Sequence, residues 1–263
     1  MTQSRVVLIT GASLGLGRAM ALGLLEAGHR IFAMGRSRER LAALEAEVAA
    51  LGRAEQLTTA QGDVRVAADC EATLEAARRA FGNVDVLINN AGFHLEESAK
   101  FYELSEAEWR ASFDTNITGA FFMARAVVGG MLARGWGRIV NHQTNYATML
   151  RAGMNPYGPA KAALEAATAS WAAELAGTGV TVNEILPGGA ADVARLSVER
   201  FPDRSKLVAP AVLVAPIRWL VSTESDAYSG YRIVANRWNA GATISDNLAA
   251  AAELAGWRGP LTP

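Results

Sequence analysis

Tyr157 and Lys161 stand four residues apart in the stretch Tyr-Gly-Pro-Ala-Lys, and together they suit proton transfer. Positions i and i+4 of a helix lie on one face, so the two side chains would project together. A free phenol titrates near roughly pH 10, and a shift to neutrality requires about 4 kcal/mol. An ammonium about 4 Å away supplies about that much at an effective dielectric near 20. We predict that Tyr157 is an acid/base group activated by Lys161; an ordinary surface pair is the alternative.

A helix must present this pair, and the sequence predicts one from Pro156 to about residue 176. Asn155 suits its cap and Pro156 its first turn. Glycines at positions 177 and 179 predict its end.

The composition limits the classes of function. Half of the 263 residues are hydrophobic and the formal net charge is -1, which gives no electrostatic footprint for nucleic acid or an anionic membrane. The single cysteine, Cys70, excludes an intrachain disulfide and fits a reducing compartment. The first apolar run, Val6 to Ile9, is too short for a signal peptide or a membrane span. We expect a cytoplasmic protein with no nucleic-acid or membrane partner and no metal site.

Apolar, β-branched runs alternate with helical patterns along the chain. Strands are expected at residues 5–10, 30–34, 56–61, 84–88, 138–141, 180–186 and 231–235. This alternation predicts an α/β fold: a doubly wound, Rossmann-like parallel sheet of about seven strands, with helices on both faces. No linker or repeat interrupts it, so we expect residues 1–263 to form a single dinucleotide-binding and catalytic domain. Residues 241–263 would be a C-terminal extension.

Two local features of the helix expected at residues 105–134 can be anticipated. Ser105 and Glu108 have the spacing of a capping box. Asn116 and Gly119 are poor helix formers, so the helix is expected to be distorted near them.

A glycine-rich turn follows the first strand, with the spacing GxxxGxG over Gly11 to Gly17. A strand, such a turn and a helix N-terminus together form an anion site, because free N–H groups and the helix dipole meet there. The second strand ends without a carboxylate at Met34 or Gly35, and Arg36 follows, which favours the 2′-phosphate of NADP. The alternatives are an ordinary turn and a solvated arginine.

Together these motifs resemble the short-chain dehydrogenase/reductase family over about residues 4–240. The matching residues are Thr10, Gly11, Gly15 and Gly17; Asn89-Asn90-Ala91-Gly92; Asn116; Ile139-Val140-Asn141; Tyr157 and Lys161; and Pro187-Gly188. The resemblance implies a catalytic tetrad of Asn116, Thr144, Tyr157 and Lys161. In it Tyr157 exchanges the proton, Lys161 lowers its pKa and holds the nicotinamide ribose, Thr144 binds the substrate oxygen, and Asn116 anchors a water.

The resemblance also implies the contacts to cofactor and substrate. The expected cofactor contacts are Gly11, Ser13, Leu14, Gly15, Leu16, Gly17, Arg36, Asp63, Val64, Asn90, Ala91, Gly92, Tyr157, Lys161, Pro187, Gly188 and Asp192. The expected substrate pocket comprises His94, Thr144, Tyr146, Met149, Leu150 and Tyr157, with selectivity also from the segment 190–207 and its Arg195, Arg200 and Arg204.

Three departures from the family pattern stand out. Thr144 occupies a position that is usually serine, which keeps the hydroxyl and adds a methyl group. Asp192 stands where a threonine often contacts the nicotinamide amide. The last strand lacks the usual Asp-Gly-Gly turn, and a helix from Ser245 or Asp246 to about Ala255 is expected to dock over the substrate crevice of its own or a neighbouring subunit. A frayed tail is the alternative.

The predicted function is NADP-dependent interconversion of a small-molecule ketone or aldehyde and an alcohol, in a homodimer or homotetramer formed through helices 105–134 and 156–176. One alternative is a 3-oxoacyl carrier-protein-type reductase, which Glu174 near the end of the catalytic helix disfavours because carrier proteins are acidic. The other is a catalytically silent cofactor sensor or scaffold, which the retained tetrad disfavours.

Overall fold

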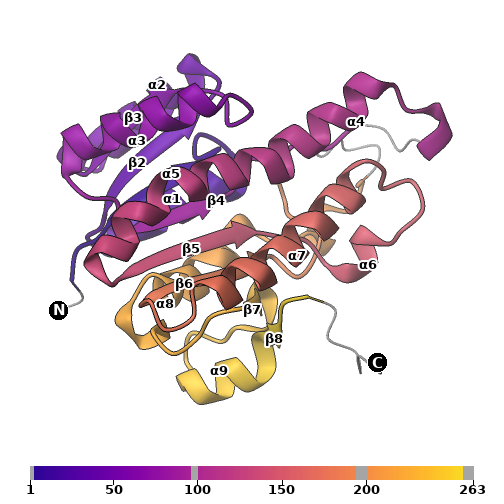
Figure 1. The fold of residues 1–263 in the computed structure, drawn as a ribbon. Coiled ribbons are helices and arrows are strands. Elements are labelled where there is room, and N and C mark those ends of the chain that lie inside the picture. The colour runs from indigo at the N-terminus through magenta and orange to yellow at the C-terminus, as the bar shows by residue number, and fades with distance from the viewer. Residues whose placement is uncertain (1–2, 96–99, 194–200, 257–263) are drawn as a thin grey trace.

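The computed structural model describes residues 3–95, 100–193 and 201–256. Its centre is a sheet of eight strands in the order β3-β2-β1-β4-β5-β6-β7-β8 (Figure 1). Seven strands run parallel and β8 pairs with β7 in the antiparallel direction. The strands are β1 Val6–Thr10, β2 Arg30–Gly35, β3 Leu57–Gln61, β4 Val86–Asn89, β5 Gly137–His142, β6 Val180–Leu186, β7 Tyr231–Val234 and β8 Ala252–Leu254. The predicted doubly wound sheet is confirmed, and β8 is an addition to it.

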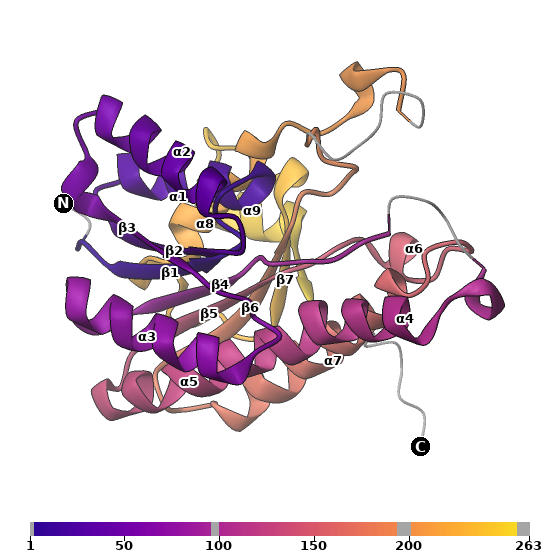
Figure 2. The ribbon, with the colours of Figure 1, turned by 90° about the horizontal axis from the view of Figure 1, so that it is seen from above.

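Helices cover both faces of the sheet (Figure 2). One face carries α1 Gly15–Glu26, α2 Arg38–Ala50, α8 Val214–Leu220 and α9 Ile244–Ala251, and the other carries α3 Ala67–Phe81, α5 Gly119–Arg134 and α7 Tyr157–Glu174. The short helices α4 Glu106–Phe113 and α6 Tyr146–Met149 extend beyond the strand ends. Shorter 3-10 turns lie at Ala54–Gln56, Phe101–Glu103, Arg204–Lys206, Pro210–Leu213, Thr223–Ser225 and Ala235–Arg237.

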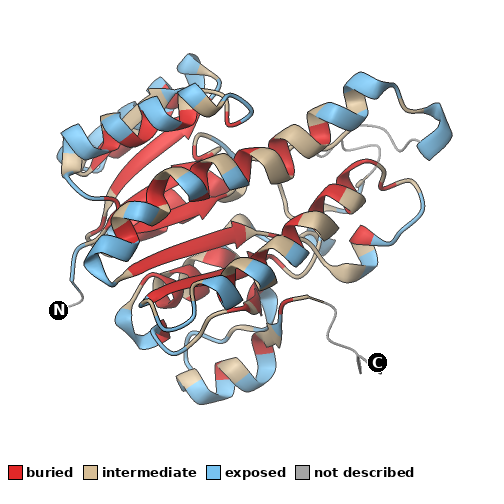
Figure 3. Ribbon diagram, in the orientation of Figure 1, coloured by how far each residue is buried: buried red, intermediate tan, exposed pale blue. Residues whose placement is uncertain are grey.

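The central strands are buried on both faces (Figure 3). Val7 and Ile9 of β1 pack into the core under α1, α2 and α8, whereas Val6 and Leu8 pack into the core under α3 and α5. Successive side chains of a strand point to opposite faces, so a strand between two helical layers has to be apolar throughout. This explains the continuous apolar runs of the sequence.

The long helical run Glu106–Arg134 is interrupted where the sequence predicts distortion. Ser105 and Glu108 form the expected capping box. A π-helical turn, Asp114–Thr118, then joins α4 to α5. In a π turn the hydrogen bonds shift from i+4 to i+5, which widens the helix at that point. The turn contains the predicted catalytic residue Asn116.

By length and composition this run would also be able to cross a membrane. Its α5 part packs on α3, β4 and β5, and Met123, Val127 and Met131 are buried in that core. These contacts account for its apolar character within the fold.

The helix α7 begins at Tyr157, and the expected cap by Asn155 is wrong. Pro156 occupies the N-cap position, no side chain caps the helix, and the Asn155–Pro156 peptide bond is cis. The helix ends at Glu174, ahead of the two glycines that predicted its end.

The C-terminal extension packs at the edge of the sheet. Thr243, not Ser245 or Asp246, caps α9, and the helix ends at Ala251 because the chain turns into β8. Ile244 and Leu248 pack against the core on the α8 face. The expected docking over the substrate crevice of the same chain is therefore wrong for residues 244–256. Docking over the crevice of a neighbouring subunit stays a prediction, and residues 257–263 lie outside the described part.

Candidate active site

A cleft of about 800 Å³ lies at the carboxyl ends of the parallel strands. This volume falls within the range of about 300–1,000 Å³ that is usual for ligand pockets. Its walls come from the segments that follow β1 to β6, as the doubly wound topology predicts. Among the predicted cofactor contacts, the residues that line it are Gly11, Ser13, Leu14, Gly15, Leu16, Gly17, Arg36, Asp63, Val64, Asn90, Ala91, Gly92, Tyr157, Lys161 and Pro187.

The glycine-rich loop and the end of β4 are held together by hydrogen bonds. The Thr10 hydroxyl oxygen accepts from the backbone N–H groups of Asn90 and Ala91, both at 3.0 Å. The Asn90 amide donates to the carbonyls of Thr10 and Gly11, both at 3.0 Å. A Cβ on Gly17 would lie 2.4 Å from the Asn90 amide nitrogen and 2.4 Å from the Gly11 carbonyl. The loop therefore lies so close to Asn90 that only glycine fits at position 17.

The helix α1 begins at Gly15 without a side-chain cap, so its first N–H groups are left for another acceptor. Gly11 and Gly15 adopt positive φ values of +63° and +57°, which glycine tolerates best. The glycine cradle and this helix N-terminus suit a pyrophosphate. We therefore regard this half of the cleft as the dinucleotide site.

Two arginines line the cleft beyond β2. Arg36 is one of them, as predicted, and Arg40 is the other. Arg38, which lies between them, does not line it. The Ser37 hydroxyl caps α2, so Arg40 lies in the first turn of that helix. The position of Arg40 in the first turn of α2 was the available signal, because the start of this helix follows the end of β2.

The proposed proton-transfer pair lies at the other half of the cleft. Tyr157 and Lys161 are both buried, and both line the cleft beside Thr144. The Lys161 ammonium donates to the His142 carbonyl at 2.6 Å and lies 5.8 Å from the centre of the Tyr157 ring. The His94 ring packs against Tyr157, with 4.7 Å between ring centres. The structure thus brings Tyr157, Lys161 and Thr144 together, with His94 beside them.

Asn116 lies beneath the cleft instead of in its wall. Its side-chain oxygen accepts from the Phe93 N–H at 3.3 Å. Its amide donates to the carbonyls of Phe93 at 2.8 Å and Ser112 at 2.9 Å. These bonds join the π turn to the loop after β4, so the side chain supports that loop. Its expected role as a water anchor stays a prediction.

Five predicted contacts do not line the cleft. Gly188 adopts φ +86° and packs closely on Asn236. An added Cβ at this position would lie 1.9 Å from the Asn236 side-chain oxygen. The Asp192 carboxylate pairs with Arg204, which removes it from the expected contact to a nicotinamide amide. The other three expected contacts that do not line the cleft are Tyr146, Met149 and Leu150.

The short helix α6 explains why these three side chains do not line the cleft. Met149 is buried in the protein and Leu150 is 75% exposed to solvent. The Tyr146 hydroxyl donates to Glu165 of α7 at 2.8 Å, so its side chain points toward that helix. The turn of α6 instead directs Ala147, Thr148 and Arg151 to the cleft.

Other wall residues were not predicted individually: Met34, Gly35, Ser37, Gly62, Thr115, His142, Gln143, Asn145, Met154 and Gly189. From the predicted selectivity segment, Ala190, Ala191, Val193 and Phe201 line the cleft. Arg195 and Arg200 lie outside the described residues.

The family of short chain dehydrogenases matches residues 5–200 of this sequence. The matched region contains the glycine-rich loop, the end of β4, Thr144 and the Tyr157–Lys161 pair. The chain belongs to the short chain dehydrogenase family. The resemblance inferred from the motifs is thereby confirmed.

Within this short chain dehydrogenase family, curated relatives are identical to this chain at about a third of the aligned residues. It is 37% identical to the NADP-dependent 3-hydroxy acid dehydrogenase YdfG of Salmonella typhi over 183 residues. The aligned residues cover 70% of this chain and 71% of that protein. It is 34% identical over 186 residues to the 3-oxoacyl-acyl-carrier-protein reductase FabG of Vibrio cholerae, covering 71% of this chain and 73% of that protein.

A solved structure gives the same fold. A variant of the actinorhodin polyketide ketoreductase with NADPH superposes with a TM-score of 0.79 at 30% sequence identity. The match covers 87% of this chain and 95% of that chain.

Gly17→Ala tests the glycine cradle of this short chain dehydrogenase. The added Cβ would collide with Asn90 and with the Gly11 carbonyl, so the loop has to shift. We expect the dissociation constant for NADPH, measured by fluorescence titration, to rise about tenfold or more, equal to about 1.4 kcal/mol.

Gly129→Ala in α5 is the matched control, because an added Cβ there meets nothing within 4 Å. We expect this variant to bind NADPH like the wild type. Equal affinities of the Gly17→Ala variant and the wild type would contradict the assignment of the cradle.

Proposed function

We propose that this protein is an NADP-dependent carbonyl reductase that interconverts a ketone or aldehyde and the corresponding alcohol. The observation that carries the proposal is the buried pair of Tyr157 and Lys161 beside Thr144, in the same cleft as the glycine cradle. The proton-transfer groups and the dinucleotide site thus share one cavity. The catalytically silent alternative is disfavoured because the cleft retains three of the four tetrad side chains in its wall.

The chemistry follows from the position of each group. When bound, NADPH supplies the hydride that reduces the carbonyl carbon. The Tyr157 hydroxyl gives its proton to the carbonyl oxygen, and the Thr144 hydroxyl donates a hydrogen bond to that same oxygen. Lys161, held by its bond to the His142 carbonyl, stabilises the phenolate that remains.

The substrate end of the cleft suits a small-to-medium, largely apolar carbonyl compound. Met154, Val193 and Phe201 supply apolar walls, whereas His94 and Arg151 supply polar groups. Such a mixture orients a ligand by a few polar contacts within an apolar enclosure.

Replacing Tyr157 by phenylalanine tests the chemistry, since the ring stays and only the proton donor is lost. We expect turnover to fall at least about a hundredfold, the low end of a general-acid effect, while the dissociation constant for NADPH stays near that of the wild type. The assay is NADPH oxidation read at 340 nm with a panel of ketones. A Phe variant that keeps more than about a hundredth of wild-type activity would show that Tyr157 is not the acid.

The choice of NADP rests on Arg36 and Arg40, because both line the cleft after β2 and no carboxylate stands at Met34 or Gly35 to bind a ribose hydroxyl. A planar guanidinium suits a phosphate. The relative named as NADP-dependent and the neighbouring structure with NADPH support the same cofactor.

Alanine variants at three arginines test this choice. A charged hydrogen bond contributes about 1.5–3 kcal/mol, so Arg36→Ala and Arg40→Ala should each lower the preference for NADPH over NADH by about tenfold or more. Arg38→Ala is the matched control, since Arg38 does not line the cleft. The measurement is kcat/KM for each cofactor. Equal use of both cofactors by the wild type, or an equal loss in the Arg38 variant, would contradict the assignment.

We also infer a cytoplasmic location, supported by the state of the single cysteine. Cys70 is free and buried in α3, and burial raises the pKa of its thiol to about 11. It is therefore a packing residue, and no disulfide is needed for the fold.

A homodimer or homotetramer through α4, α5 and α7 is the assembly that we propose. Large apolar side chains are exposed along α4 and α5: Trp109 of α4 is 40% exposed, and Phe121 and Leu132 of α5 are each 42% exposed. An exposed apolar surface of this kind favours contact with another protein surface.

Light scattering at micromolar concentration should therefore give twice or four times the mass of one chain. Phe121→Glu should shift the mass toward the monomer, because it places a charge within the proposed interface. Leu51→Glu is the control, since Leu51 is also exposed but follows α2 on the opposite layer. A monomeric wild type would contradict the proposed assembly.

A further inference from the structure

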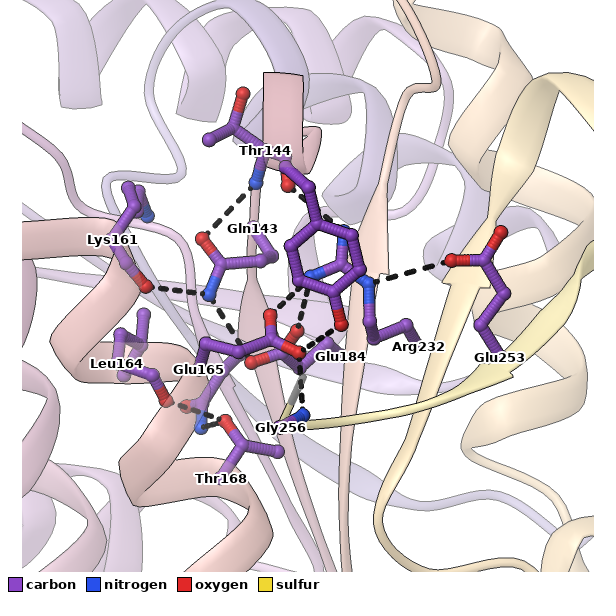
Figure 4. Close-up of polar contacts among 12 residues, drawn as sticks. Gln143, Thr144, Lys161, Leu164, Glu165, Thr168, Glu184, Arg232, Glu253 and Gly256 are labelled. Carbon is purple, nitrogen blue, oxygen red and sulfur yellow. Dashed lines mark hydrogen bonds and ion pairs between the residues drawn. The ribbon is translucent and has the colours of Figure 1, made fainter. Parts of the chain in front are cut away.

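A row of charged side chains crosses three adjacent strands under α7. Glu184 of β6 is the register partner of Arg232 in β7, and Arg232 is the register partner of Glu253 in β8. Register partners of neighbouring strands point to the same face of a sheet. Glu165 of α7 points toward this row from the helical layer (Figure 4).

Three of these residues are fully inside the protein. Glu165 and Glu184 are 0% exposed and Arg232 is 1% exposed, and we call these three the buried charge cluster. The Arg232 guanidinium pairs with Glu165 and lies 3.4 Å from a Glu184 oxygen. Burial, together with the neighbouring Glu165, raises the pKa of Glu184 well above its ordinary value.

A buried ion pair is an expensive way to stabilise a fold, because apolar residues of similar volume often do as well or better. The contacts of the buried charge cluster indicate another role. They lead directly to the segment that carries the catalytic Thr144 (Figure 4).

Both backbone groups of Thr144 are held from below. Arg232 donates to the Thr144 carbonyl at 3.0 Å. The Gln143 side-chain oxygen accepts from the Thr144 N–H at 3.1 Å. The Gln143 amide in turn donates to Glu184 at 3.1 Å and to the Lys161 carbonyl at 3.0 Å. Thr144 is therefore linked to the buried charge cluster and to the catalytic helix at the same time.

Tyr146 adds a further restraint on the same segment. Its hydroxyl donates to Glu165 at 2.8 Å, and the Arg232 guanidinium lies 3.8 Å from the centre of its ring. The Gly256 N–H donates to the same Glu165 oxygen at 2.8 Å, and Glu253 lies 3.9 Å from Arg232. The C-terminal strand thus closes the cluster from the edge of the sheet.

We propose that the buried charge cluster is a positioning device that fixes the backbone of Thr144 and thereby the place of its hydroxyl in the cleft. The cluster residues act through Thr144 and do not touch the substrate. A hydroxyl that donates to the reacting oxygen must be held in a precise position to stabilise the transition state more than the ground state. A small displacement of this hydroxyl lowers the rate of the reaction. This inference rests on the proposed carbonyl reduction.

A double-mutant cycle between Arg232 and Thr144 tests the proposal. Arg232→Lys keeps a cation near Glu165 but removes the fork that also reaches the Thr144 carbonyl. Thr144→Ala removes the hydroxyl and leaves the carbonyl in place. We expect Arg232→Lys to lower kcat/KM for the ketone about tenfold in the wild type, but less than about twofold in the Thr144→Ala background. The dissociation constant for NADPH should stay near that of the wild type in both.

Arg138→Lys is the matched control. Arg138 is also 1% exposed and pairs with Asp226, but it lies at the start of β5, away from the cleft. We expect this variant to lower the melting temperature without changing kcat/KM in either background, when activity is assayed well below melting.

Gln143→Met provides a second double-mutant cycle with Thr144→Ala, and it leaves the charge of the protein unchanged. This cycle tests the positioning role if the Arg232→Lys variant does not fold. This substitution removes the acceptor of the Thr144 N–H. The fold-loss of kcat/KM that it causes should likewise be smaller in the Thr144→Ala background than in the wild type. An active wild type with equal fold-losses in both backgrounds would overturn the positioning role alone. A wild type that reduces no ketone would overturn the proposed function and the inference with it.

Discussion

Polar groups that are buried in the sheet need hydrogen-bond or ion-pair partners inside the protein. Two sets of such contacts hold the walls of the cleft. At the dinucleotide half, Thr10 and Asn90 join the ends of β1 and β4 and hold the glycine-rich loop between them. At the catalytic half, Arg232 and Glu165 join β7 to α7 and hold the segment with Thr144. Both halves thus depend on polar contacts between elements that are distant in sequence.

Most of the fold follows from patterns that the sequence displays openly. The apolar runs locate the seven parallel strands to within a few residues, since strands buried on both faces must be apolar throughout. Ser105 and Glu108 predicted the start of α4, and the weak helix formers Asn116 and Gly119 predicted the distortion that is the π turn. The cofactor half was accessible because the glycine-rich turn lies between a strand and a helix N-terminus, where free N–H groups suit a phosphate.

The catalytic half was only partly accessible, because its geometry depends on tertiary contacts. Tyr146 was expected in the pocket from its position after β5, but its hydroxyl bonds to Glu165, whose location below the loop no local pattern indicates. Asp192 was expected to meet the cofactor, but it pairs with Arg204, twelve residues away along the chain. A charged residue within an apolar strand, such as Glu184 or Arg232, was the one signal of the buried charge cluster. The eighth strand was missed because its three residues are too few to show a strand pattern.

The central claim is that the cleft transfers a hydride from a nicotinamide to a carbonyl carbon. Its most direct test uses NADPH carrying deuterium at both C4 positions of the nicotinamide, incubated with the protein and a panel of ketones, followed by mass spectrometry of the alcohols. We predict an alcohol with one deuterium on the carbon that bears the hydroxyl, formed in step with the loss of absorbance at 340 nm. An alcohol without deuterium, or no oxidation of NADPH with any ketone, would contradict it.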